Sequence, residues 1–225
     1  MQEEGKKGII VAAKAITIAQ QKGGAGKTTI AAQLAVALIK AGKKVGVIDI
    51  DPQGSLARWY EVRQALVEGG CDNLTLVHAS GWRLSTELDR LKRTSDVVLI
   101  DSPPHAETDV RIAVRAADLI LVPIQPSPMD LWATQATLDA AKKESTPVMM
   151  VFNRTPTRGK LVEAVRRKII EMDVPVAQTV LGNRVAFAAS MMEGKGVMES
   201  HARHTAAKEI RALAEEISAH IGLGG

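Results

Sequence analysis

One short segment combines glycines and lysines at a spacing that suits phosphate binding. It reads Lys22-Gly23-Gly24-Ala25-Gly26-Lys27-Thr28-Thr29 and lies between an apolar stretch at residues 16–19 and a helical pattern. The glycines let backbone N–H groups turn inward around phosphate oxygens, because a Cβ there would crowd the anion or forbid the dihedral angles. The N-terminus of the following helix adds a favourable dipole. The segment therefore predicts a phosphate-binding loop.

The loop also contains side chains suited to a magnesium–nucleotide. Lys27 is expected to bridge the β- and γ-phosphates, and Thr28 to give its hydroxyl to Mg²⁺. Loops of this kind usually have glycine at position 21, where this chain has Gln21, and a second lysine, Lys22, stands at the mouth of the loop. A turn without a ligand is the alternative, but a strand before and a helix after favour binding. The predicted phosphate contacts are Gly23, Gly24, Ala25, Gly26, Lys27, Thr28 and Thr29.

Three aspartates complete the set of residues that could do chemistry. Asp49 and Asp51 end one apolar run, and Asp101 ends another. Alternation along a strand puts Asp49 and Asp51 on the same side. A magnesium–nucleotide needs carboxylates near the ion and a group that orients the attacking water. We therefore predict that Thr28, Asp49 and Asp101 hold Mg²⁺, Asp101 through water, and that Asp51 positions the water. The alternative is that each aspartate caps a following helix or turn.

Short apolar runs alternate with helical patterns along the chain. The runs are of strand length and mostly β-branched, at residues 15–20, 44–48, 74–78, 97–100, 119–123, 148–152 and 174–181. The helical patterns cover residues 28–41, 82–93, 106–116, 128–144, 158–172 and 203–221. This alternation predicts a three-layer α/β fold, a mostly parallel twisted sheet of about seven strands with helices on both faces. Such sheets bind ligands at the carboxyl ends of their strands, where the loop and the aspartates lie.

Length and composition limit the class of protein. The 225 residues fit one domain, expected at 15–221 with flexible ends at 1–14 and 222–225. Aromatic residues are only 3%, so the core must consist of aliphatic side chains and methionine. The single cysteine, Cys71, excludes an intrachain disulfide and thiolate-bound metal clusters, and favours a reducing cytoplasm. No run of 18 apolar residues exists, so no membrane span is expected. The apolar residues 9–13 are too few for the core of a signal peptide, and Glu3 and Glu4 precede them, so no signal peptide is expected.

The motifs resemble the ParA/MinD family of P-loop ATPases with a deviant Walker A motif. Besides the loop, the matches are Asp49-Ile-Asp-Pro-Gln-Gly54 and Val98-Leu-Ile-Asp-Ser-Pro-Pro104, with weaker ones at Pro123-Ile-Gln-Pro-Ser127 and Val151-Phe-Asn-Arg154. The likeness runs from about residue 16 to 219, and Asp-Pro-Gln is closer to ParA than to MinD. The resemblance implies the P-loop NTPase fold and an ATPase that uses ATP and Mg²⁺, with slow turnover until a partner stimulates it.

The resemblance also implies roles for individual residues. Lys22 would be the signature lysine, reaching across a homodimer to the phosphates of ATP held by the partner, so that ATP is sandwiched at the interface. Asp130 and Trp132 would lie near this dimer face. Asn153 would contact the adenine edge, with Pro175 nearby. The catalytic set would be Lys22, Lys27 and Asp51.

Positive charge is concentrated late in the chain. Residues 154–211 contain eleven Lys/Arg against six Asp/Glu, a balance of +5, whereas the whole chain has a net charge of +4. ParA relatives bind DNA without sequence preference, so the resemblance implies a non-specific DNA partner and a place at the nucleoid in the ATP state. No aromatics interleave these charges, which favours phosphate contact; a solvated helix face is the alternative. The candidate contacts are Arg154, Arg158, Lys160, Arg166, Arg167, Lys168, Arg184, Lys195 and Arg203.

Three classes of function remain open. The first is a switch that partitions or positions a cargo, such as a plasmid, a chromosome or a protein cluster, and is released by a ParB-like or other ATPase-stimulating adaptor. The second is a metabolic or maturation enzyme on the same scaffold, of which a reductase or cluster carrier would need paired cysteines. The third is a membrane-associated MinD-like regulator. The apolar stripe at residues 208–221 has acids on its polar face, so no stable membrane association is expected. No helix-turn-helix module precedes the loop, so operator-specific repression is not expected.

Overall fold

The computed structural model describes residues 12–104, 107–156 and 161–223. Seven strands in these ranges form one sheet in which all neighbours are parallel, in the order β3-β2-β4-β1-β5-β6-β7. The strands are β1 (Lys14–Ile18), β2 (Val45–Asp49), β3 (Leu74–His78), β4 (Val97–Asp101), β5 (Leu119–Ile124), β6 (Val148–Thr155) and β7 (Val176–Gly182). The predicted parallel α/β sheet is confirmed.

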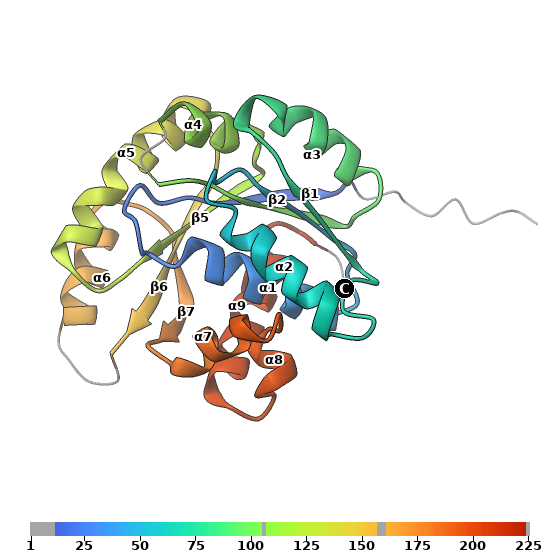
Figure 1. Cartoon of the computed structure of the whole chain (residues 1–225). Helices are drawn as coiled ribbons and strands as arrows, with labels where there is room; N and C mark the ends of the chain where they lie inside the picture. Colours follow the sequence, from blue (N-terminus) through green and yellow to red (C-terminus); the bar gives the residue numbers. More distant parts are fainter. Residues whose placement is uncertain (1–11, 105–106, 157–160, 224–225) are drawn as a thin grey trace, which may run out of the picture.

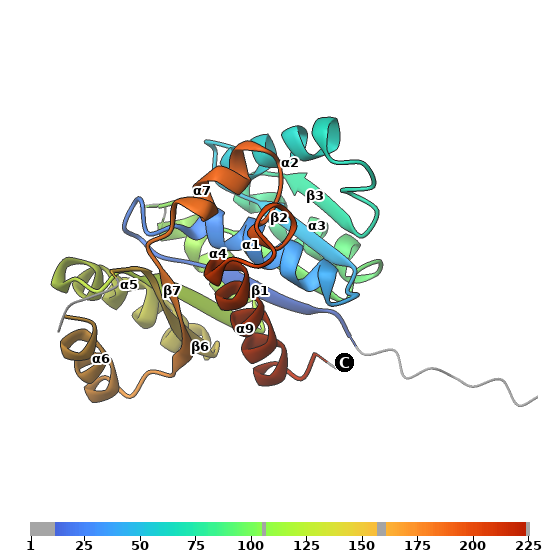
Figure 2. The same ribbon diagram turned by 90° about the horizontal axis from the view of Figure 1, so that it is seen from below.

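Helices cover both faces of the sheet, which gives the three layers expected (Figures 1 and 2). One face packs against α1 (Lys27–Lys40), α2 (Ser55–Leu66), α7 (Val185–Met192), α8 (Val197–Ser200) and α9 (Thr205–His220). The other face packs against α3 (Leu84–Lys92), α4 (Glu107–Ala116), α5 (Pro128–Glu144) and α6 (Leu161–Glu171), with a short 3₁₀ turn, η1 (Gly81–Arg83), before α3.

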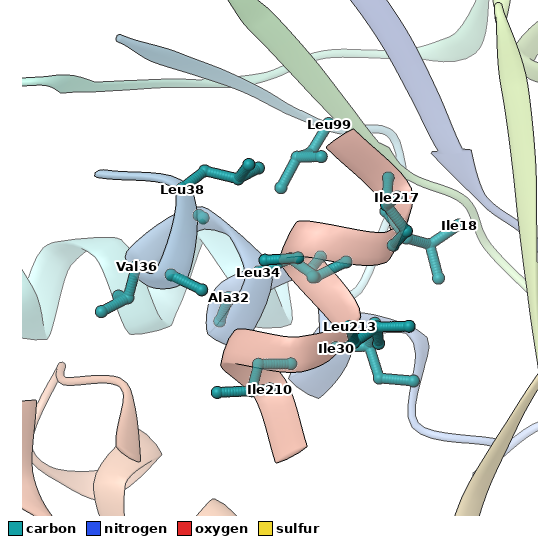
Figure 3. Close-up of a cluster of buried hydrophobic side chains, with 14 of the residues drawn as sticks. Ile18, Ile30, Ala32, Leu34, Val36, Leu38, Leu99, Ile210, Leu213 and Ile217 are labelled. Atoms are coloured by element: carbon teal, nitrogen blue, oxygen red, sulfur yellow. The ribbon is translucent and has the colours of Figure 1, made fainter. Parts of the chain in front are cut away.

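The central strand β1 shows how the sequence builds these layers. Ile16 and Ile18 pack into the cluster under α1 and α9, whereas Thr17 points to the opposite face and donates to the carbonyl of Ala113 in α4. Side chains of α1 and α9 interdigitate beneath the sheet (Figure 3). The residues labelled there include Ile30, Leu34 and Leu38 from α1 and Ile210, Leu213 and Ile217 from α9, all fully buried. Burying each such side chain stabilises the fold by about 1.5–3 kcal/mol.

The strand order explains why the phosphate loop and the aspartates meet. From β1 the chain passes to β2 and β3 and then returns to β4, which lies between β2 and β1; β5 then pairs on the other side of β1. The register places Ile18 opposite Asp101, and Asp49 opposite Asp101. The ends of β1, β2 and β4 therefore bring the loop and both carboxylates to one edge of the sheet, at the reversal of strand order where open α/β sheets bind ligands.

Three helices were not expected from the sequence. In α2 the buried face consists of Leu56, Trp59 and Arg63, so a charged residue occupies a position where the helical pattern requires an apolar one. Arg63 is only 2% exposed because it bonds to Glu199 and to two backbone carbonyls. The short α7 is apolar on nearly every side, and α8 has only four residues, so neither shows a helical period.

Leu223 lies in the range that was expected to be flexible, but the structure packs it against the core. Leu223 is buried in the cluster under α9, and its N–H donates to the carbonyl of Ser218. Core packing therefore includes residue 223. Among the described residues, no helix is both long and apolar enough to cross a lipid bilayer.

Candidate nucleotide-binding site

The phosphate loop connects β1 to α1, as expected. α1 begins at Lys27, and its N-cap is Gly26, whose φ of 94° lies in the left-handed region that favours glycine. A Cβ at Gly26 would clash with Asn153 Nδ2, so a side chain here would displace Asn153 from its bond to the carbonyl of Ala25. Gly24 also has a left-handed φ, of 77°. The loop therefore leaves the first N–H groups of α1 open for an anion.

The two lysines of the loop have different partners. Lys27 Nζ donates to the backbone carbonyl of Gln20 at 3.0 Å, and burial lowers the pKa of this lysine, an effect that Asp101 and Asp51 oppose. Lys22 Nζ lies 2.5 Å from Asp130 Oδ2, and Asp130 is only 1% exposed. Ser127 also donates to the Asp130 carboxylate from its hydroxyl. Lys22 is thus held in an ion pair, whereas Lys27 bonds to a neutral group.

The carboxylate of Asp101 fits a metal site. Thr28 Oγ1 donates to Asp101 Oδ2 at 2.7 Å, while Asp101 Oδ1 is buried and has no hydrogen-bond partner among the described residues. Burial raises the pKa of Asp101 to about 7, the hydroxyl of Thr28 opposes this rise, and the neighbouring Asp49 adds to it. A buried carboxylate with an unsatisfied oxygen, beside a threonine hydroxyl, is a suitable oxygen donor set for Mg²⁺.

Asp49 mainly stabilises the backbone around it. Its Oδ1 accepts from the N–H of Asp51 at 3.0 Å, and its Oδ2 accepts from the N–H groups of Leu56 at 3.1 Å and Ala57 at 3.0 Å. Leu56 and Ala57 belong to the first turn of α2, so Asp49 caps that helix from the end of β2. Burial raises the pKa of Asp49, and these backbone bonds lower it. Both oxygens of Asp49 therefore already have partners in the protein. The metal role expected for Asp49 stays a prediction.

Removing the Asp49 carboxylate is expected to destabilise the fold. Asp49→Ala should lower the free energy of unfolding by about 2–4 kcal/mol, because α2 loses its cap and three N–H groups lose their acceptor. Urea denaturation without nucleotide measures this. Asp51→Ala, in a half-exposed turn, is the matched control and should cost less than about 1 kcal/mol. Equal stability of Asp49→Ala and the unmodified chain would contradict the capping role.

Asp51 faces the phosphate loop across a groove. Its Oδ1 accepts from the N–H of Gln53, and its carbonyl accepts from Gly54 N–H and lies 3.1 Å from His78 Nε2. The carboxylate is therefore held in a tight turn after β2. The groove has a volume of about 230 Å³. Its lining residues are Gly23, Gly24, Gly26, Lys27, Thr28, Thr29, Asp51, Pro104 and Arg154. The structure thus brings the predicted water-positioning carboxylate to the predicted phosphate site.

A larger cavity of about 490 Å³ continues from this groove, since Gly26, Thr29 and Arg154 line both. Asn153, the predicted adenine contact, lines the cavity and donates from Nδ2 to the carbonyl of Ala25 at 2.8 Å. Other lining residues include Gln125, Gly182, Asn183 and Phe187. A cavity joined to a phosphate groove has the arrangement that a nucleoside phosphate requires.

The structure places Pro175 away from the cavity, although it was expected near the adenine contact. Pro175 precedes β7 at the amino end of that strand, where its carbonyl accepts from Met150 N–H, and it does not line the cavity. Gly182 and Asn183, at the carboxyl end of β7, line the cavity together with Asn153 instead. The sequence contained a signal for them, because polar residues directly after a strand gather at the ligand-binding edge of a parallel sheet.

The predicted DNA contacts do not form one surface. Arg166, Arg167 and Lys168 lie on α6, and Arg184, Lys195 and Arg203 belong to the region of α7 to α9, which covers the opposite face of the sheet. Several are paired: Lys168 with Glu171, Arg184 with Glu209, and Lys195 with Glu193. Arg166 lies over the ring of Phe152. Arg154 contacts the phosphate loop, and Arg158 and Lys160 lie outside the described residues.

The fold and the site define a P-loop nucleotide-binding α/β protein. Residues 16–197 match the family described as the CobQ/CobB/MinD/ParA nucleotide binding domain. The chain belongs to this family, as its motifs predicted.

Individual relatives agree with this assignment. The chain is 30% identical over 209 residues to maintenance of carboxysome distribution protein A of Halothiobacillus neapolitanus, covering 90% of this chain and 95% of the relative. It is 29% identical over 241 residues to the chromosome-partitioning ATPase Soj of Thermus thermophilus, covering 92% and 96%. The solved structure of the septum site-determining protein MinD of Pyrococcus horikoshii, complexed with Mg-ADP, has a TM-score of 0.78 at 23% identity, and the match covers 94% of this chain and 98% of that one. At that identity the solved structure supports the fold alone.

Proposed function

We propose that this chain is a ParA-type ATPase that binds Mg²⁺–ATP, dimerises around it and hydrolyses it slowly. The observation that carries the proposal is the position of Lys22 at the mouth of the phosphate loop, paired with Asp130 beside two exposed apolar side chains of α5. Met129 is 61% exposed and Trp132 is 68% exposed. Apolar side chains next to a nucleotide groove suit a surface that a second copy covers once ATP is bound.

In this proposal each group at the loop has a separate task. Lys27 and the loop amides bind the phosphates, Thr28 and Asp101 hold Mg²⁺, and Asp51 orients the attacking water. Lys22 leaves Asp130 and reaches the phosphates of ATP in the partner subunit. The site is then complete only in the dimer, which makes hydrolysis slow in the monomer.

The proposed role of the cycle is to position a cargo in the cytoplasm. The relatives named for carboxysome distribution and for chromosome partitioning support this class of function. The cargo is a protein cluster, a plasmid or a chromosome, and an adaptor, ParB-like or of another kind, stimulates hydrolysis and releases the ATPase. In its ATP state the dimer binds DNA of any sequence and so associates with the nucleoid.

The proposed DNA surface runs around the edge strand β7. Arg167 on α6 is exposed, as are Arg203 before α9 and Lys208 and Arg211 within it, and none of the four forms an ion pair with the residues that the structure describes. These charges lie on α6 or in and just before α9, the two helices that pack beside β7 on opposite faces of the sheet. Unpaired surface cations of this kind bind DNA phosphates by releasing counterions.

Reversing three charges on α6 should weaken DNA binding. The Arg166→Glu, Arg167→Glu and Lys168→Glu triple variant is expected to raise the dissociation constant of the ATP-bound protein for duplex DNA, which should lie on the order of 10⁻⁴–10⁻⁶ M before substitution. The logarithmic salt slope should decrease by roughly 0.9 for each phosphate that the variant no longer neutralises. Filter binding at several salt concentrations measures both, with Lys142→Glu and Lys143→Glu on α5 as the control. Unchanged affinity would remove α6 from the DNA surface.

Co-sedimentation separates the proposed function from the alternatives. The protein is mixed with plasmid DNA or with liposomes of anionic lipid, each with ATP or with ADP. The proposal predicts sedimentation with DNA in ATP and little in ADP, and none with liposomes. ATP-dependent liposome binding would support a MinD-like regulator, and binding to neither would support an enzyme on the same scaffold.

A further inference from the structure

Arg154 has a strained backbone at the carboxyl end of β6. Its φ is 49°, in the left-handed region that costs a non-glycine residue on the order of 1 kcal/mol or more. The side chain reaches the phosphate loop, where Nη1 donates to the carbonyl of Gly24 at 3.0 Å. Gln125 Nε2 donates to the same carbonyl at 3.2 Å. Strained residues of this kind often lie at ligand sites, where the surrounding structure determines their conformation.

The charge of Arg154 is not neutralised. Lys22 is paired with Asp130, and Arg184 is paired with Glu209, whereas Arg154 bonds to a neutral carbonyl and has no carboxylate partner among residues 12–104, 107–156 and 161–223. The side chain is also exposed. A cation without a counter-charge at the rim of a groove attracts an anion.

Arg154 lies where the two hollows of the site meet. It lines the phosphate groove of about 230 Å³ together with Lys27 and Asp51. It also lines the cavity of about 490 Å³ together with Asn153. A nucleotide with its base in the cavity and its phosphates in the groove must pass this junction.

We propose that Arg154 binds phosphate oxygens of the nucleotide held by its own chain, from the open side of the loop, and is not a DNA contact. The inference rests on the proposed nucleotide site and adds to it a cation from the same subunit, next to the loop lysine. A guanidinium suits this position because it can bond to two phosphate oxygens at once. Its bond to Gly24 places the guanidinium near the phosphates before the nucleotide arrives.

The test is a titration of fluorescently labelled ADP and of a labelled, non-hydrolysable ATP analogue with Mg²⁺. Arg154→Ala is expected to raise both dissociation constants about 10- to 100-fold, because a charge-assisted hydrogen bond to the phosphates is removed. Arg154→Lys keeps the charge but not the paired donors. Its dissociation constants should lie between those of Arg154→Ala and those of the unmodified chain. Lys142→Ala, an exposed lysine near the C-terminal end of α5, is the matched control and should bind as the unmodified chain does.

Circular dichroism and DNA binding are also measured for Arg154→Ala, to separate a lost phosphate contact from misfolding and from a lost DNA contact. Alanine at φ 49° carries the same backbone strain as arginine, so Arg154→Ala should fold; Arg154→Gly, which tolerates this φ, replaces it if circular dichroism shows otherwise. With nucleotide at saturation, Arg154→Ala should bind DNA as the unmodified chain does. Unchanged nucleotide affinity of Arg154→Ala, or weakened DNA binding alone, would overturn the inference. An unmodified chain that binds no nucleotide would instead overturn the proposed function on which it rests.

Discussion

Lys22→Ala is expected to lower the ATPase rate by about 10³-fold or more and to leave the protein monomeric in ATP. A cation that reaches the transferring phosphoryl group from a partner is worth roughly 10³–10⁵ in rate. Lys22 does not line the groove or the cavity of its own chain, so the affinity of the monomer for nucleotide should change less than about threefold. A coupled ATPase assay, size-exclusion chromatography with ATP, and a nucleotide titration measure the three quantities.

Two variants separate the role of Lys22 from a structural role of its ion pair. Asp130→Asn also breaks the ion pair with Lys22 but keeps Lys22 itself, so it should retain ATP-dependent dimerisation. Lys22→Arg keeps the positive charge and should recover part of the rate. The proposed contact of Lys22 with ATP in the partner subunit is wrong if Lys22→Ala hydrolyses ATP as fast as the unmodified chain does. It is also wrong if Asp130→Asn loses dimerisation to the same extent as Lys22→Ala.

Asp101→Asn is expected to stabilise the nucleotide-free protein at high pH. The pKa of Asp101 is raised from 3.8 to about 7 by burial, so the folded state binds a proton more tightly than the unfolded state does. Its contribution to stability is therefore fully present below about pH 4 and is lost as pH rises to about 7. The difference between the two pKa values corresponds to about 4 kcal/mol as an upper bound. Asparagine has no charge to bury, so the variant should gain up to that amount above pH 7.

The same variant should lose function. Without the Asp101 carboxylate, the Mg²⁺-dependent rate of ATP hydrolysis is expected to fall about 100-fold or more. In the unmodified chain the affinity for Mg²⁺–ATP should fall as pH drops below about 7, because a proton competes for the carboxylate. Thermal denaturation between pH 5 and pH 8 and ATPase assays with and without EDTA test both halves. A variant that is less stable at pH 8, or one that keeps its Mg²⁺ dependence, would contradict the roles given to Asp101.

The sequence predicted the sheet and the loop well because both depend on local patterns. Ile16 and Ile18 form part of a buried apolar strand, and the glycines that follow form a turn that few other residues can form. The strands end at Asp49 and Asp101, and parallel strands bring their carboxyl ends to one edge. These features depend on neighbours in the chain or on a general rule of parallel sheets, so they can be inferred from one sequence.

The features that the sequence could not predict depend on contacts between distant segments. Asp49 has the spacing of a metal ligand, but its position at the end of β2 lets it cap α2. The sequence grouped Arg154 with the basic residues that follow it. In the structure it has a left-handed backbone and bonds to the carbonyl of Gly24. The helix α2 was not predicted because a charged residue, Arg63, occupies its buried face. Arg63 can be buried because it pairs with Glu199, 136 residues away in the sequence. No pattern within one segment shows such pairs.

Every role given to these residues requires that the loop between β1 and α1 binds adenine nucleotide with Mg²⁺. Isothermal titration calorimetry with ATP can decide this, on the unmodified chain and on Lys27→Ala, each with Mg²⁺ and with EDTA. We expect the unmodified chain to bind ATP, and to bind it more weakly in EDTA. Lys27→Ala should lose about 100-fold or more in affinity, while near-ultraviolet circular dichroism shows its fold intact. Equal heats of binding for the two proteins, or no binding by either, would contradict a nucleotide site at this loop.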